Sequence, residues 1–180
     1  MVELSQAEVF PLIRGGGLFL IVAGLSIVIG AFAFRARYPI FGLGAAIGGA
    51  LTAYYAAPLA APYGKPDLLQ IVSLVGAVAI EMAFLVAVLR AQRTVGERDT
   101  MLGILTVVGG HFVLMAPAFG PIMLALAGVS VLSTLLALLW RGYPAPLVWG
   151  LDGVFKTVAG TMMFTGHELP CTMCVRWSLT

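Results

Sequence analysis

Forty consecutive residues, from Met101 to Trp140, contain no Asp, Glu, Lys or Arg. As one helix they would extend about 60 Å, which is about twice the thickness of a bilayer's hydrocarbon core. The helix breakers Pro117, Gly120 and Pro121 lie near the middle of this run. The run is therefore predicted to fold back on itself as two membrane-spanning helices.

The composition of the whole chain also favours lipid as its surroundings. Of the 180 residues, 61% are hydrophobic and 10% are charged, and the mean hydropathy is +1.03. Soluble domains are about 45–50% apolar and about 25% charged. One span needs about 20 apolar residues, so the chain has room for about six crossings and for no separate soluble domain. We expect an all-α polytopic membrane protein with a single transmembrane domain over residues 1–180.

Apolar runs bounded by charges and by Pro or Gly predict a bundle of about six transmembrane helices with short loops. The predicted spans are 11–34, 39–61, 68–90, 101–117, 119–140 and 147–166, followed by a tail over 167–180 that contains Cys-x-x-Cys. Ala31-Phe32-Ala33 loosely fits a signal-peptidase site, but the acidic residues before the first run and the arginines after it favour a retained span.

Basic residues predict the orientation of this bundle. The first, third and fifth connections contain Arg35, Arg37, Arg90, Arg93, Arg98 and Arg141, and the opposite side contains Arg14, Lys65 and Arg176. By the positive-inside rule, both termini are expected to be extracytoplasmic. The expected location is a plasma membrane of the bacterial inner-membrane type. The net charge of +2 and the absence of a Lys/Arg run give no support for nucleic acid as a partner.

Ionisable side chains recur at one depth in three predicted spans. Glu81, His111 and Lys156 each lie nine or ten residues from the same predicted face, about 15 Å deep and near the midplane. Asp152 lies one turn from Lys156 on the same face of its helix. Each charge at the centre of a span costs about 2.5–3.5 kcal/mol on insertion scales. These side chains are therefore expected to point into the bundle and to pair there.

The cluster has a structural and a functional interpretation. Asp152 and Lys156 can neutralise each other and have no further role. Glu81 then has no permanent cation unless His111 is charged. A carboxyl group that alternates between protonated and paired forms, beside Lys and His, suits a proton relay or a coupled solute site. We therefore predict transport or proton-relay roles for Glu81, His111, Asp152 and Lys156.

The glycine pattern and the hydroxyl residues of the predicted spans each have two possible structural roles. Gly44 and Gly48 form a small-xxx-small pattern, which favours close packing within one subunit or a face for a homo-oligomer or a membrane-complex partner. Hydroxyl side chains in the last three spans can bond across helices or to their own backbone. These hydroxyl residues are Thr106, Ser130, Ser133, Thr134, Thr157 and Thr161.

The tail combines His167 with Cys171 and Cys174, the two cysteines of the chain. On the predicted topology it lies where disulfides persist. A c-type haem site is excluded, because Val175 stands where that site needs His. A metal site would lack an evident fourth ligand, so a redox or structural disulfide is favoured.

The segment PCTMCVRW resembles the first cysteine pair of the quinone-linked disulfide bond formation protein B family. The resemblance covers these eight residues and implies a redox pair at Cys171 and Cys174, with Arg176 on the quinone side. Six residues remain after Cys174, where that family continues into a further helix, and no second cysteine pair is present. A two-pair relay within this chain is therefore excluded.

The leading prediction is a small membrane transporter or channel that moves protons, ions or a small polar solute through the buried charges. One alternative is a non-catalytic accessory or assembly subunit of a membrane complex. Another is a thiol-disulfide or metal-handling membrane protein that uses His167, Cys171 and Cys174. The sequence has no phosphate-binding glycine loop and no nucleophile elbow, it requires no cofactor, and its loops are too short for the pocket of a soluble-type enzyme.

Overall fold

The computed structural model describes residues 6–33, 35–92, 94–140 and 142–166, which form helices and no strand. The all-α fold class is confirmed. The helices are α1 (Gln6–Val9), α2 (Ile13–Phe32), α3 (Arg37–Ala60), α4 (Leu68–Ala91), α5 (Glu97–Phe119), α6 (Ile122–Leu139) and α7 (Ala145–Thr165). The six long helices correspond to the six predicted spans, and the short α1 is an addition.

Five helices, α2 to α6, are long and apolar enough to cross a membrane. The 21-residue α7 is not among these five, because the charges of Asp152 and Lys156 lower its hydropathy. Five of the six predicted spans therefore correspond to helices that meet this criterion of length and composition. The sixth corresponds to α7, which contains two buried charges.

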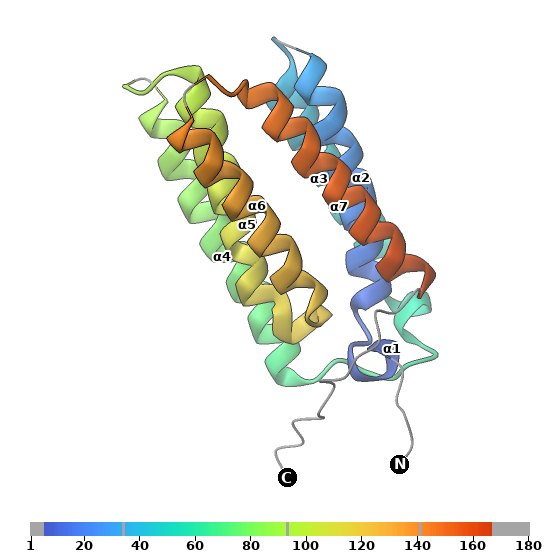
Figure 1. The fold of residues 1–180 in the computed structure, drawn as a ribbon. Coiled ribbons are helices and arrows are strands. Elements are labelled where there is room, and N and C mark those ends of the chain that lie inside the picture. The colour runs from blue at the N-terminus through green and yellow to red at the C-terminus, as the bar shows by residue number, and fades with distance from the viewer. Residues whose placement is uncertain (1–5, 34, 93, 141, 167–180) are drawn as a thin grey trace.

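The long helices form two groups of three (Figure 1). The first half consists of α2, α3 and α7, and the second half consists of α4, α5 and α6. The grouping does not follow chain order, because α7 returns from the second half to pack along α2. The two halves meet where α7 contacts α5 and α6 and where α2 contacts α5. We call this boundary the seam.

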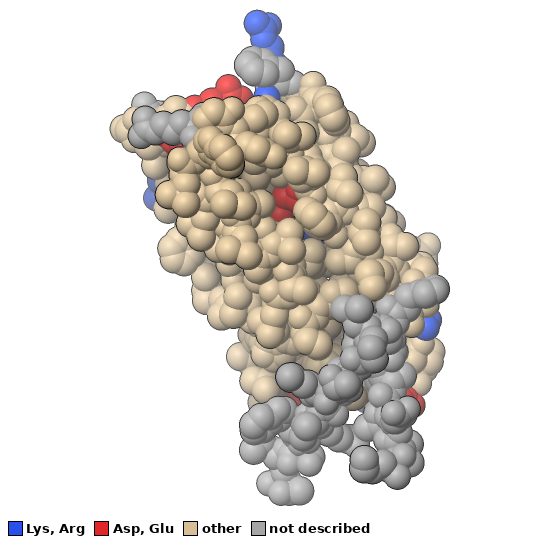
Figure 2. Space-filling model, viewed as in Figure 1, with Lys and Arg blue, Asp and Glu red and all other residues tan. Residues whose placement is uncertain are grey.

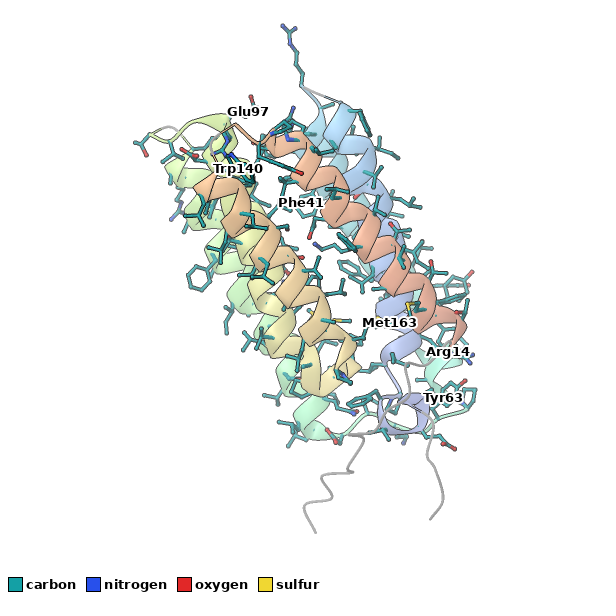
Figure 3. All side chains as sticks on the ribbon, in the orientation of Figure 1. Arg14, Phe41, Tyr63, Glu97, Trp140 and Met163 are labelled. Carbon is teal, nitrogen blue, oxygen red and sulfur yellow. The ribbon has the colours of Figure 1, made fainter. Side chains whose placement is uncertain are left out.

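Successive long helices run in opposite directions, so alternate helices begin at the same end of the bundle. Glu97 and Trp140 mark the end at which α3, α5 and α7 begin (Figure 3). Arg14 and Tyr63 mark the opposite end, where the Arg14 guanidinium lies 4.9 Å from the centroid of the Tyr63 ring. We refer to these as the Glu97 end and the Arg14 end.

The hairpin between α5 and α6 differs from its predicted boundaries. The fifth helix begins at Glu97, ahead of the predicted Met101, and continues through Pro117 to Phe119. Pro117 lies in the last turn of α5, where its missing N–H removes one backbone hydrogen bond but the helix still continues to Phe119. Gly120, with a φ of 89°, makes the turn instead, since this left-handed region favours glycine.

Glycines on α2 and α7 face each other at backbone distance. A Cβ atom placed on Gly24 would lie 2.6 Å from the carbonyl oxygen of Gly153, and one on Gly153 would lie 2.7 Å from that of Gly24. The pair Gly17 and Gly160 shows the same reciprocal approach, at 2.6 and 2.7 Å. In both helices the two glycines are seven residues apart, which places them on one face. Glycine at these positions is therefore what lets α7 lie against α2.

The glycine face of the second span is also occupied within the chain. Gly44 lies against Ser26, and Gly48 lies against Phe19 and Val22, all on α2. Both glycines are buried. This face forms the contact between α2 and α3 within the chain.

Substituting a glycine in the contact between α2 and α7 should destabilise the bundle. We expect Gly153→Ala to cost about 1–3 kcal/mol, because the new methyl group overlaps the α2 backbone. The measurement is thermal unfolding of the purified protein in detergent. Gly128→Ala is the matched control, since a Cβ there meets open space, and it should leave stability unchanged or raise it. Equal midpoints for the two variants would contradict the close contact.

Candidate functional site

Asp152 and Lys156 form a buried ion pair within α7. Their side chains are 1% and 2% exposed, and the Lys156 Nζ donates a hydrogen bond to the Asp152 Oδ2. They are four residues apart, so they lie one above the other on the helix surface. The hydroxyl of Ser130 on α6 donates to the other carboxylate oxygen of Asp152, at 2.5 Å. This bond crosses the seam.

The Lys156 ammonium lies between three helices. Its Nζ is 3.5 Å from the Ser130 Oγ and 5.3 Å from the centroid of the Phe112 ring on α5. A cation above an aromatic ring is attracted by the ring's negative face. Lys156 is therefore held by a carboxylate on its own helix and by polar and aromatic groups of the opposite half.

Glu81 and His111 form a second pair, within the second half. The His111 Nε2 lies 3.5 Å from the Glu81 Oε2, and the side chains are 4% and 17% exposed. Glu81 comes from α4 and His111 from α5. The contact therefore joins α4 and α5 near the middle of each helix, far from the loop that connects them.

The two pairs adjoin each other through Phe112. The rings of His111 and Phe112 lie 4.5 Å apart, and Phe112 in turn faces Lys156. The four residues predicted from the sequence thus form one group, which together with Ser130 we call the charged cluster.

The charged cluster holds two carboxyl groups and one ammonium group. With both carboxyl groups ionised and His111 neutral, its net charge is −1. A buried charge without compensation is costly in an apolar medium. Uptake of one proton or one monovalent cation brings the total to zero, so the cluster is suited to hold a single positive charge.

Asp152 and Lys156 on α7 and Ser130 on α6 are buried behind the face that these two helices form. Figure 2 shows acidic atoms, with basic atoms beside them, at mid-height of this face. The middle of the face shows no other charged residue.

Ser130 and Phe112 are the members of this site that the sequence does not distinguish. The other predicted hydroxyl residues of the spans bond to backbone carbonyls of their own helices. Ser130 differs because its side of α6 faces α7. No spacing rule separates Ser130 from Ser133, since the rotation of α6 about its axis decides which one meets Asp152.

The predicted tail site lies outside the described residues. His167, Cys171, Cys174 and Arg176 all fall in 167–180, so the thiol and metal predictions stay predictions. Within the described part of the chain, no group of three or more His, Cys, Asp and Glu residues could hold a metal ion.

Residues 4–170 match the model of a family described as Family of unknown function (DUF6609). The chain belongs to this family. The part matched to DUF6609 includes all seven described helices and the whole charged cluster. No curated protein and no solved structure matches the chain. Membership in DUF6609 therefore assigns no activity to the chain.

Removing one partner of the buried pair should destabilise the protein more than removing both. We expect Lys156→Met to cost about 3–5 kcal/mol, because it leaves the Asp152 carboxylate buried without its cation. The double variant Asp152→Leu, Lys156→Met should recover much of this loss. Thermal unfolding in detergent measures both variants, with Lys65→Met in the exposed loop after α3 as the control. The single variant Asp152→Leu is measured as well. A loss of stability in the double variant equal to the sum of the losses in the two single variants would contradict the pairing.

Proposed function

We propose that the protein is a small membrane transporter or channel that passes protons or another small monovalent cation along the seam. In this proposal all six long helices cross the membrane, and α7 can do so because its two charges face the second half. The observation that carries the proposal is the charged cluster. It joins both halves at mid-height and contains two carboxyl groups but only one ammonium group.

The location of the cluster argues for function beyond stability. Asp152 and Lys156 alone would neutralise α7. Glu81 and His111 add a carboxyl group and an imidazole that this purpose does not need, on two other helices. Ionisable residues inside membrane spans are costly, and they typically mark ion or proton pathways.

The two pairs have different roles in this proposal. Asp152 is bonded to both Lys156 and Ser130, so this pair forms a fixed part of the site. Glu81 and His111 lie 3.5 Å apart and accept the arriving proton, either as a carboxylic acid beside imidazole or as carboxylate beside imidazolium. Both forms make the cluster neutral. Release of the proton restores the charge of −1 and readies the site for the next one.

We propose that the Glu97 end faces the cytoplasm. Arg35, Arg37, Arg90 and Arg98 lie at this end, whereas Arg14 and Lys65 lie at the other. Basic residues near span ends favour the cytoplasmic side. Both ends of the described chain then lie on the extracytoplasmic side, since α2 begins and α7 ends there.

Proton flux into liposomes tests the proposal. Purified protein is reconstituted with a trapped pH-sensitive dye, the membrane potential is clamped, and acid is added outside. We expect faster acidification than in empty liposomes, and we expect Glu81→Gln to lower the rate to that of empty liposomes, because the amide cannot carry the proton. Lys156→Met should also lower it.

Matched controls and a second ion complete this experiment. Glu8→Gln in α1 and Lys65→Met in the loop after α3 make the same chemical changes outside the cluster and should retain flux. Gradients of Na⁺ and K⁺ in place of the acid pulse identify a cation other than the proton. Flux that is unchanged in both Glu81→Gln and Lys156→Met would end the proposal.

The accessory-subunit alternative is favoured by one observation. The outermost helices α3 and α4 bury few residues, and α4 exposes a long series of large apolar side chains such as Leu68, Val72 and Val75. Lipid or a partner helix can cover such a face. A stoichiometric partner that co-purifies from native membranes, together with absence of flux from the lone protein, would favour the alternative.

A further inference from the structure

Arg37 is a buried arginine that links the two halves at the Glu97 end. It opens α3 in the first half, and its side chain is 2% exposed. The Arg37 Nη1 lies 3.3 Å from the Glu97 Oε1 and donates to the Met101 sulfur at 2.6 Å. Glu97 and Met101 both belong to α5 in the second half. The guanidinium therefore spans the seam.

An aromatic layer separates Arg37 from the charged cluster. Trp149 on α7 is fully buried and lies three residues before Asp152. The rings of Tyr38 and Phe41 on α3 meet Trp149 edge to face, with centroids 6.3 and 5.8 Å apart. Figure 3 places Phe41 between the two halves, below the level of Glu97. These ring contacts lie within the first half, beside the seam.

Aromatic rings pack on glycines at the Arg14 end, where Gln70 of α4 also donates a hydrogen bond to the Val9 carbonyl oxygen at 2.9 Å. A Cβ atom on Gly16 of α2 would lie 2.5 Å from the ring of Phe119 on α5. The ring of Phe10 packs in the same way on Gly120. The contacts between the halves thus differ at the two ends, with an ion pair at one and aromatic rings on glycines at the other.

We propose that the pair Arg37 and Glu97 is the gate of the seam at the Glu97 end. The inference rests on the proposed function, because a gate requires a pathway. These two contacts of Arg37 across the seam suit repeated opening. Glu97 is 45% exposed, so water can replace this partner, and the thioether sulfur of Met101 is a weak acceptor. Separation of the pair lets the halves part at this end while the Arg14 end stays closed.

Labelling of an introduced cysteine tests the gate without measuring transport. Thr134 on α6 is 1% exposed and lies one turn from Ser130 toward the Glu97 end. Thr134→Cys is placed in a background with Cys171→Ser and Cys174→Ser, and the protein is held in lipid nanodiscs so that lipid covers its sides. The rate of reaction with a charged, membrane-impermeant maleimide reports how often the end opens.

We expect Arg37→Ala to raise the labelling rate about tenfold. This corresponds to a decrease of about 1.4 kcal/mol in the free energy that favours the closed state over the open state. Glu97→Gln should raise it as well, and it covers the case in which Arg37→Ala does not fold. Arg37→Lys keeps the positive charge and should label more slowly than Arg37→Ala. Labelling by Arg37→Ala and Glu97→Gln at the parent rate, or by Arg37→Lys as fast as by Arg37→Ala, would overturn the gate.

Arg98→Ala is the matched control at the same end. Arg98 donates to the Ala137 carbonyl and pairs with Asp99 at 3.6 Å, so both contacts stay within the second half. Arg98→Ala should leave the labelling rate unchanged. If it raises the rate as much as Arg37→Ala does, the effect is a general loosening of this end, and the proposed gate is wrong. Flux in the parent protein with no effect of Arg37→Ala on labelling removes the gate alone. Absence of flux removes the proposed function whatever the labelling shows.

Discussion

The backbone contact between α2 and α7 is the interaction on which the rest of the structure depends. In lipid, helices gain little from burying apolar side chains against each other, so close backbone packing has to supply part of the association. Reciprocal glycines at Gly24 with Gly153 and at Gly17 with Gly160 provide this packing. They also set the rotation of α7, so that the adjacent face, with Asp152 and Lys156, is directed at the second half.

The same helix therefore holds the halves together and carries the charges between them. Ser130 bonds Asp152 across the seam, and Phe112 faces Lys156 from the second half. Any movement of one half against the other changes the surroundings of these two charges. In the proposed transporter, the charge state of the site favours one arrangement of the halves over another.

The sequence selected the ionisable residues of the site but not all of the contacts that they make. Counting residues from the span ends placed Glu81, His111 and Lys156 at one level, because helical rise is constant. The pairing of Asp152 with Lys156 followed from their spacing of four. The contact of Glu81 with His111 and the choice of Ser130 depend on how each helix is turned about its axis. In nearly uniformly apolar helices, no hydrophobic stripe reveals that rotation.

The sequence by itself determined the all-α class, the approximate helix bounds and the presence of charges at mid-span, since hydropathy and helix breakers are local properties. Tertiary structure alone decided that α7 joins α2 and α3, that Gly44 and Gly48 face α2, and that Arg37 is buried against α5. These features arise from contacts between residues distant in the chain. Their energies depend on the mutual fit of backbones and side chains, which no single segment encodes.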